Sequence, residues 1–197
     1  MTRPRLLYLN NTAGPAPPAL TALPNLEVAD VPQYGASLAG ADIIYVPMHA
    51  DQRDLADRGD LAEAVETGTI LIVNGHVAHP FHPALTPFVP SPGKGLAALR
   101  VERLAPHPLF DDVPLETLNF TKGVAGFYAR GGNPAPSGAT IIHTVGPQKL
   151  TVDWLLPHPS GGALFVHAGN DIIPFLHRAG ALKRFFDRIF PTHAHSA

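Results

Sequence analysis

Asparagine, histidine and aspartate side chains follow four of the five most apolar runs of the sequence, close to the point where each run ends. Imidazoles transfer protons near neutral pH, and amides and carboxylates form directional hydrogen bonds to small ligands. If the runs are parallel strands, their carboxyl ends meet at one edge of a sheet, where open α/β sheets bind ligands. The sequence therefore predicts one site with His76 as the acid/base and with ligand-binding positions at Asn10, Asn11, His49, Asn74, His79, His167, Asn170 and Asp171.

Each of these positions also has a structural interpretation, and the residues alone leave both open. Asn10 and Asn11 begin a loop rich in Gly and Pro, where asparagine commonly forms turns. Asp51 is expected to cap a following helix, and the pair Asn170-Asp171 can cap another. His76 is the strongest candidate for chemistry, because a bulky imidazole directly after a core strand is an unusual turn residue. Its structural alternative is a buried, hydrogen-bonded ring behind the turn.

The spacing of His76, His79 and His82 raises the question of a metal site, since imidazoles are common zinc ligands. Pro80 and Pro83 prevent the helix that would place these rings on one face, and the chain has no Cys, so we assign no metal. The sequence also lacks a Gly-x-Ser-x-Gly elbow and a Walker loop. It therefore predicts neither a nucleophilic serine nor nucleotide hydrolysis, and the cofactor stays unknown.

The elements that would position this site are short apolar runs bounded by turn residues, as in the buried strands of a parallel sheet. Between the third and fourth runs, residues 51–68 have helical apolar spacing with Gly68 as a stop, which predicts a right-handed crossover between parallel strands. A closing amphipathic helix is expected over 172–190. The five strands are expected at 5–10, 26–31, 42–47, 69–74 and 162–169.

Further strands are expected at 96–104 and 139–145, as antiparallel additions at a sheet edge or as a small subsheet. The run LTVDWLL (150–156) alternates apolar and polar residues, which predicts a strand that leads through a tight Ser-Gly-Gly turn into the last core strand. The stretch from His76 to Gly95 contains five prolines and has no helical period, which predicts a long irregular connection. Lys122, Tyr128 and Arg130 lie in a Gly- and aromatic-rich insertion, which suits either a lid or a solvated loop.

Length and composition indicate one domain over residues 1–190, followed by a flexible tail at 191–197. The chain has 197 residues, is 45% hydrophobic and has a formal net charge of −2. It has no basic block that would neutralise nucleic-acid phosphates. Its N-terminus has too few apolar residues for a leader or a membrane span, so we expect a cytoplasmic protein without nucleic-acid or membrane partners. The sequence is compatible with a homo-oligomer as well as with a monomer.

Three segments in order resemble the ThuA-like (trehalose-utilisation) proteins and the related class I glutamine amidotransferases. They are GTILIVNGHVAHP (68–80), VERLAPHPLFDDVP (101–114) and WLLPHPSGGALFVHAGND (154–171), within a similarity over about residues 40–190. The resemblance implies a flavodoxin-like three-layer fold, with a mostly parallel sheet plus antiparallel edge strands. It departs from these families at two places: His76 lies where amidotransferases have the nucleophilic Cys, and Gly169-Asn170 replaces the late Gly-His of ThuA-like proteins.

Two functions follow from these observations. Without any Cys the chain is not a glutaminase or amidotransferase, because that reaction needs a thiol nucleophile. The first hypothesis is a ThuA-like protein that acts on or binds a small polar metabolite, such as a sugar derivative, with His76 as acid/base. The second is a non-catalytic binding or assembly module whose site has decayed. The polar strand ends favour the first, and the missing nucleophile favours the second.

Overall fold

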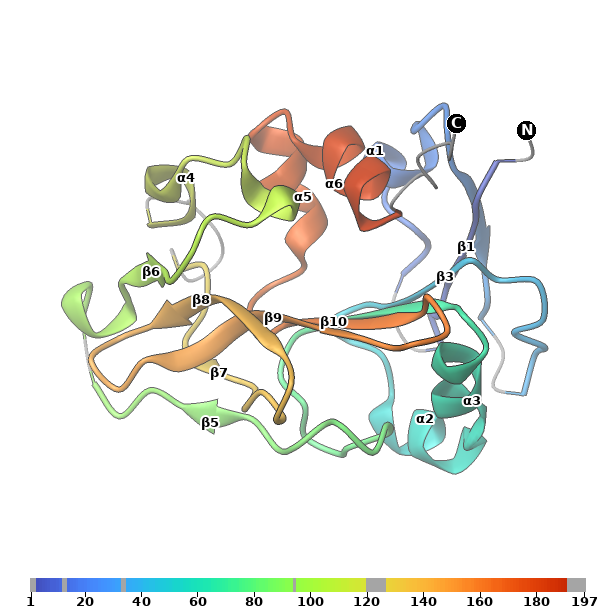
Figure 1. Cartoon of the computed structure of the whole chain (residues 1–197), viewed down its shortest axis with the longest axis horizontal. Helices are drawn as coiled ribbons and strands as arrows, with labels where there is room; N and C mark the ends of the chain where they lie inside the picture. The colour runs from blue at the N-terminus through green and yellow to red at the C-terminus, as the bar shows by residue number, and fades with distance from the viewer. Residues whose placement is uncertain (1–2, 12–13, 33–34, 94, 120–126, 191–197) are drawn as a thin grey trace.

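The centre of the molecule is an eight-stranded sheet in the order β2-β1-β3-β4-β10-β9-β8-β6 (Figure 1). The structure is a computed structural model and describes residues 3–11, 14–32, 35–93, 95–119 and 127–190. The first five strands of this order pair in parallel and the last three pair antiparallel, which confirms the predicted fold class. The strands are β1 (Arg5–Tyr8), β2 (Glu27–Asp30), β3 (Ile43–Val46), β4 (Ile70–Asn74), β6 (Val101–Arg103), β8 (Thr140–Val145), β9 (Leu150–Pro157) and β10 (Ala163–His167).

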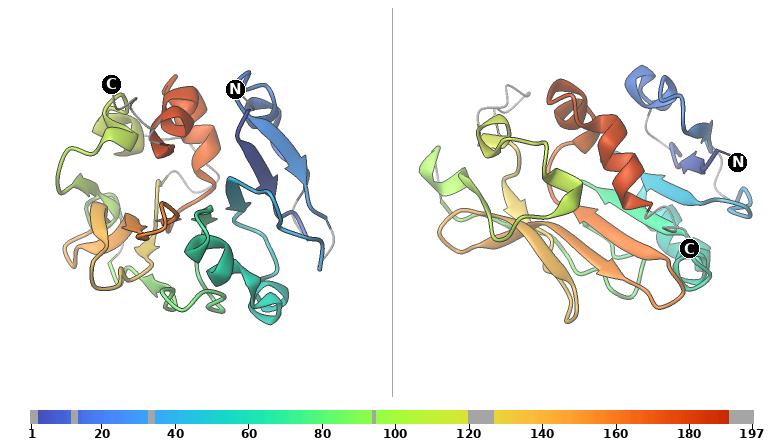
Figure 2. Two further views of the ribbon diagram at one scale, coloured as in Figure 1. Left: turned by 45° about the vertical axis from the view of Figure 1, so that its right-hand side comes forward. Right: turned by 45° about the horizontal axis from the view of Figure 1, so that its top comes forward.

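Helices cover both faces of the parallel part of the sheet, which explains why its central strands β3, β4 and β10 are apolar on both faces along nearly their whole length. Figures 1 and 2 show α1 (Pro18–Thr21), α5 (Ile172–Arg178) and α6 (Leu182–Ile189) on one face, and α2 (Gln52–Arg58) and α3 (Asp60–Glu66) on the other. Alternate residues of β3 belong to two separate cores: Ile43 and Tyr45 lie on the α5 face, and Ile44 and Val46 on the α2 face.

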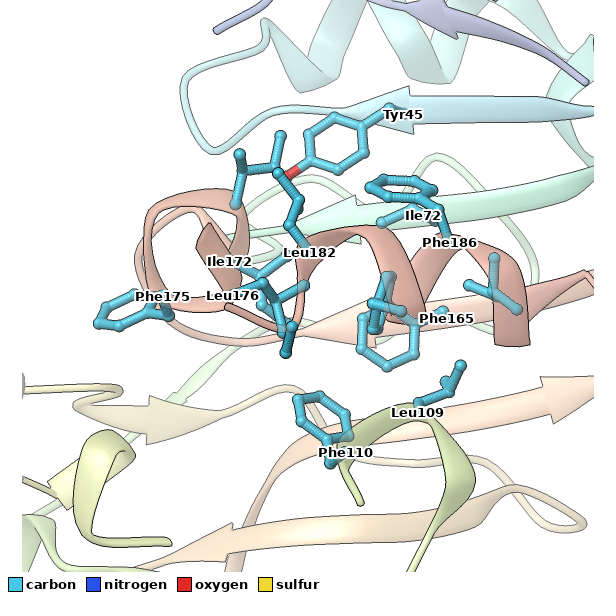
Figure 3. Close-up of a cluster of buried hydrophobic side chains, with 14 of the residues drawn as sticks. Tyr45, Ile72, Leu109, Phe110, Phe165, Ile172, Phe175, Leu176, Leu182 and Phe186 are labelled. Carbon is cyan, nitrogen blue, oxygen red and sulfur yellow. The ribbon is translucent and has the colours of Figure 1, made fainter. Parts of the chain in front are cut away.

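The larger core lies between the sheet and the helices α5 and α6 (Figure 3). Ile72 and Phe165, on the neighbouring strands β4 and β10, pack against side chains of the two helices, including Leu176 and Phe186. Each of these side chains is at most 2% exposed, and fully burying one such side chain stabilises the fold by about 1.5–3 kcal/mol. This packing fixes where α5 begins, and the first residues of α5 help to form the site described below.

Two predicted helices are each broken into a pair, and the predictions of single helices were wrong. The helix expected at 51–68 is α2 and α3, which meet at Gly59 with φ 73°. The helix expected at 172–190 is α5 and α6, separated by Gly180 with φ 65°. In both cases a glycine in the left-handed region ends the first helix and lets the chain change direction. The apolar spacing continues across both breaks, so the spacing alone did not reveal them.

The strand expected at 96–104 was correct only in its second half. Residues Ala97–Leu99 form a 3-10 turn, and β6 begins at Val101. The turn packs closely against the β8–β9 connection, because the carbonyl oxygen of Ala98 lies 2.4 Å from where a Cβ on Gly146 would be. The chain becomes extended only after this contact.

Several short elements were not predicted. A two-stranded antiparallel sheet joins β5 (Val89–Pro90), within the irregular connection, to β7 (Gly131–Gly132). A Cβ on Gly131 would lie 2.2 Å from the Val89 carbonyl oxygen, so only glycine allows these strands to approach so closely. This small sheet holds the segment before β7 beside the end of β10, through a bridge between Ala129 and Gly169. The 3-10 turn Pro108–Phe110 and helix α4 (Leu115–Asn119) precede that segment.

None of the helices in the described part of the chain is both long enough and apolar enough to cross a membrane. The tail expected at 191–197 and the lid candidate Lys122 lie outside the described residues.

Candidate functional site

A cavity of about 910 Å³ lies where β3, β4 and β10 end, between these strand ends and helix α5. Its size is within the usual range for sites that bind small molecules. His49 follows β3, His76 follows β4, and Asn170 and Asp171 follow β10. All four line the cavity, together with Arg130 and Arg178, which the sequence did not single out as ligand-binding residues.

His76 projects from a tight turn at the end of β4. The turn requires Gly75, which has φ 88° and whose Cβ would lie 2.7 Å from Met48 Cγ. The His76 side chain is exposed, and its ring stacks on Phe88 with 3.6 Å between ring centroids. Partial desolvation and, second, the nearby His167 lower the pKa of His76 below its usual value. The ring is therefore mainly neutral at pH 7 and able to accept a proton.

Asp171 combines a structural role with its place in the cavity. Its Oδ1 accepts a hydrogen bond from the Ile173 N–H at 3.0 Å, which confirms that it caps α5. The same oxygen accepts the Tyr45 hydroxyl at 2.6 Å. Burial raises the pKa of Asp171 above its usual value, although these two hydrogen bonds oppose the shift. The carboxylate is thus directed partly into the protein.

The side chain of Asn74, at the end of β4, forms hydrogen bonds to the end of β3 and to the start of α5. Its Oδ1 accepts the backbone N–H of Ile172, the first residue of α5, at 3.1 Å, and its Nδ2 donates to the Val46 carbonyl at 3.3 Å. The side chain is 1% exposed, and Asn74 is not among the residues that line the cavity. Asn74 therefore orients β3, β4 and α5 around the cavity.

Asn11 and His79 lie beside α2, and they are not among the residues that line the cavity. Asn11 exchanges two hydrogen bonds with the backbone of Asp51, and the Asp51 side chain caps α2 as predicted. His79 Nε2 accepts a hydrogen bond from Arg53 Nε at 3.3 Å. Asn10 does not line the cavity either.

Within the described ranges, no group of three or more His, Asp or Glu side chains is arranged to hold a metal ion. His82, the third imidazole of the sequence pattern, instead accepts the Ala84 N–H through Nδ1 at 3.1 Å.

Behind the cavity lies a buried polar group that we call the Asp153 network, formed by Asp153, His143, His167, Tyr128 and Arg103. Asp153 Oδ1 lies 2.7 Å from His167 Nδ1, and its Oδ2 lies 2.7 Å from His143 Nδ1 and 3.1 Å from the Tyr128 hydroxyl. Arg103 Nε donates to His143 Nε2 at 3.0 Å. Asp153 and both imidazoles are 0% exposed.

The network keeps Asp153 ionised. Burial alone would raise the pKa of this carboxyl group, but electrostatic attraction to His167 and the hydrogen bonds of His143 and His167 outweigh burial and lower the pKa well below its usual value. Asp153 in turn raises the pKa of Tyr128, adding to the larger effect of burial, so Tyr128 remains a donor. A buried carboxylate with three donors is fully hydrogen-bonded and has a fixed orientation.

His167 connects the network to the cavity. Its Nδ1 faces Asp153, whereas its Nε2 is buried and has no hydrogen-bond partner among the described residues. A Cβ on Gly169 would lie 2.6 Å from this Nε2 and 2.0 Å from the Tyr128 carbonyl oxygen. Gly169 lines the cavity, so the Nε2 atom lies directly behind the Gly169 backbone.

The Asp153 network predicts the tautomer of His143. Arg103 can only donate, so His143 Nε2 must accept, and the ring proton must be on Nδ1, facing Asp153. We expect long-range ¹⁵N–¹H NMR spectra at pH 7 to show a protonated Nδ1 and an unprotonated Nε2 for His143, which is the less common tautomer. The exposed His79, outside the network, is a reference in the same spectrum. A protonated Nε2 on His143 would contradict the proposed direction of the Arg103 hydrogen bond.

Sequence reasoning missed Asp153, His143 and Arg103, and it placed Arg130 only in a lid or solvated loop. The alternation in LTVDWLL was visible, but a polar residue in an alternating strand normally faces solvent. Here both faces of β9 are covered, so Asp153 and Trp154 are each 0% exposed. The sequence did contain one indication of the buried network: another predicted strand, ATIIHTV, has a single imidazole, that of His143, among apolar residues.

Comparisons with known proteins bear on the fold alone. No family model matches the sequence, and no curated protein matches it. Among solved structures, the mmIFT52 N-terminal domain aligns with a TM-score of 0.56 at 11% identity, over 97% of this chain and 99% of that one. The two share a fold. The exo-beta-1,4-mannosidase Op5Man5 from Opitutaceae bacterium strain TAV5 aligns with a TM-score of 0.44 at 11% identity, over 95% of this chain but 36% of that one.

Proposed function

We propose that this chain is a ThuA-like protein that binds a small polar metabolite, such as a sugar derivative, in the strand-end cavity, and that His76 is an acid/base there. The observation that supports this most is that four side chains from three strand ends, His49, His76, Asn170 and Asp171, line one cavity of about 910 Å³. Ligands of open α/β sheets bind at this position.

Proton transfer is the chemistry that suits His76. The ring is exposed, is positioned by Phe88, and has a lowered pKa, so a neutral imidazole is available near pH 7. Asp171 supplies a second ionisable group with a raised pKa on the same cavity wall. The lowered pKa keeps His76 a neutral base at pH 7, and the raised pKa lets Asp171 keep its proton to a higher pH than an ordinary carboxyl group, which suits the two to general acid/base catalysis. No thiol takes part, because the chain contains no Cys.

A binding module without catalysis is the second candidate. It is favoured by the engagement of Asp171 in capping α5 and in the hydrogen bond from Tyr45, which leaves less of the carboxylate for a substrate. The two candidates share the cavity and differ in turnover, so a ligand that binds and is recovered unchanged after long incubation favours the module.

The test is the replacement of His76 by alanine. Because the side chain is exposed, we expect the melting temperature to change little, as for most surface substitutions. Binding of glucose, glucose 6-phosphate or glucuronate, followed through the backbone amide signals of Gly169 and Asn170 in ¹⁵N–¹H NMR spectra, should collapse. His79→Ala, an exposed imidazole outside the cavity, is the matched control and should leave both readouts unchanged.

Two results would contradict the role of His76. A fall of several degrees in the melting temperature of the alanine variant would show that the ring is structural. Unchanged binding together with unchanged turnover would place the chemistry elsewhere in the cavity.

A further inference from the structure

We propose that Gln52 is a positioning residue for His76, because its side-chain amide holds the backbone of the turn from which this imidazole projects. The proposal rests on the proposed function, in which His76 is the acid/base of the cavity, and it adds a residue that does not itself line the cavity. It is based on the hydrogen bonds that hold residues 75–79 and on the stacking of His76 on Phe88.

Gln52, the first residue of α2, holds the turn at and after His76. Its Nε2 donates to the His76 carbonyl oxygen at 2.7 Å, and its Oε1 accepts the N–H groups of Ala78 and His79 at 2.7 and 3.0 Å. The helix does not need this side chain for its cap, since Asp51 caps α2. The amide therefore supports the turn rather than its own helix.

The inner side of the same turn is held by Asn133. Its Nδ2 donates to the Gly75 carbonyl oxygen at 2.8 Å, and its Oδ1 accepts the Val77 N–H at 3.1 Å. A primary amide carries donors and an acceptor in one plane, so it pairs with backbone groups on both sides of His76. Asn133 is 1% exposed, and this side of the turn is therefore anchored in the protein interior.

The small sheet of β5 and β7 brings Asn133 to the turn. Asn133 directly follows β7, and its carbonyl oxygen accepts Trp154 Nε1 at 2.9 Å and Thr151 Oγ1 at 2.6 Å, both on β9. A Cβ on Gly132 would lie 2.4 Å from the Thr151 carbonyl oxygen, so only glycine allows β7 to lie this close to β9. The inner anchor is thus independent of Gln52.

The outer side of the turn determines where the His76 ring lies. The Phe88 N–H donates to the Val77 carbonyl oxygen at 2.8 Å, and the rings of His76 and Phe88 stack with 3.6 Å between their centroids. Without the amide of Gln52, the backbone of His76 would be held only from its inner side. The imidazole would then occupy several positions, and a ligand that needs one of them would have to order it at a cost in entropy.

The test is Gln52→Ala, which is expected to fold because Gln52 is only partly buried and the Asn133 anchor remains. The Phe88 ring should shift the ring protons of His76 upfield in the unmodified protein, and we expect these signals to move back toward the values of an unstructured peptide in the variant. The pKa of His76 should rise toward its usual value, since partial desolvation lowers it in the intact turn.

The charged and titratable groups around the ring are the same in this variant: His49, Tyr128, Arg130, Asp171 and Arg178 in the cavity lining, and His167 behind it. Binding of glucose, glucose 6-phosphate or glucuronate, followed through the amide signals of Gly169 and Asn170, should weaken by about fivefold, the effect of losing one hydrogen bond.

Two further variants control for other effects of the substitution. Gln148→Ala, at an exposed glutamine outside the cavity, is the matched control and should leave the ring signals, the pKa and binding unchanged. Gln52→Glu can still accept from Ala78 and His79 but cannot donate to the His76 carbonyl oxygen. Its His76 ring signals should therefore lie between those of the unmodified protein and those of Gln52→Ala.

The ring signals decide the proposal without any ligand. Unchanged ring signals and an unchanged pKa of His76 in Gln52→Ala would overturn it, and a lower melting temperature in that case would show that Gln52 only stabilises the turn. Ring signals that move, together with probe binding that is unchanged in both Gln52→Ala and His76→Ala, would support the positioning role and overturn the proposed function.

Discussion

Replacing Asp153 by alanine is expected to lower the free energy of unfolding by about 3–5 kcal/mol, because it removes the acceptor for three buried donors. The imidazoles of His143 and His167 would each lose a partner at 2.7 Å, and the Tyr128 hydroxyl would lose its partner at 3.1 Å. None of these groups is exposed enough for water to replace the carboxylate without rearrangement. Urea unfolding of the variant and of the unmodified protein measures the difference.

Asp153→Asn is the matched variant and should cost clearly less than Asp153→Ala. Its amide oxygen can replace Oδ2, which accepts from His143 and Tyr128, while its NH₂ group faces His167. His167 can adapt by moving its proton to Nε2, which has no partner among the described residues, whereas Arg103 prevents His143 from doing the same. Equal losses in the asparagine and alanine variants would contradict this account of the hydrogen-bond directions.

The same carboxylate gives the fold an acid sensitivity. The pKa of Asp153 is lower in the folded state than its usual value of 3.8, so the stabilisation is complete above about pH 4. It is lost progressively as the pH falls below the unfolded pKa toward the folded one. The free energy of unfolding should therefore decrease more steeply below pH 4 in the unmodified protein than in Asp153→Asn.

The second large effect is expected for Gly169→Ala, which should lower the free energy of unfolding by about 2–3 kcal/mol through overpacking. The added methyl group would lie 2.0 Å from the Tyr128 carbonyl oxygen and 2.6 Å from His167 Nε2, and the first of these neighbours is backbone. Relief requires separation of the Ala129–Gly169 bridge, which positions Arg130 at the cavity. Binding of glucose, glucose 6-phosphate or glucuronate at the cavity should therefore weaken, and the free energy of unfolding should fall in the same variant.

Gly14→Ala is the control for this substitution, since a Cβ at Gly14 meets nothing within 4 Å and its φ is not in the left-handed region. It should change stability by no more than about 0.5 kcal/mol. An effect of Gly169→Ala as small as that of Gly14→Ala, measured by urea unfolding, would show that the Gly169 contact is not tight.

The sheet could be predicted from the sequence because burial on both faces leaves a local signature. The run TILIVN is apolar through residues 70–73, and it forms β4 between β3 and β10, the most covered part of the sheet. The helix breaks at Gly59 and Gly180 were missed because apolar spacing does not report the backbone direction on either side of a glycine. The pairing of β5 with β7 was missed because each strand has only two residues, too few for a period.

Prediction of the site was limited in a different way. The rule that strand ends converge placed His49, His76 and Asp171 near one another without any knowledge of side-chain directions. It could not show that Asn74 is turned into the protein toward Ile172, nor that Asn11 is turned toward Asp51, because both depend on rotamers and on which backbone groups need partners. The Asp153 network depends on the antiparallel pairing of β8, β9 and β10, in which His143 and His167 are each opposite Asp153.

The position of β10 within the sheet also constrains how the chain folds during synthesis. β10 is the last strand of the described residues, yet it lies between β4 and β9 and pairs Ala163 with Ile70. As the chain leaves the ribosome, the earlier strands β1 to β4 have an unpaired edge at β4, apolar from Ile70 to Val73, until β10 emerges. Such an edge is a site of aggregation, and contacts so distant in sequence form slowly. Nascent chains that stop before β10 are therefore expected to depend on chaperones.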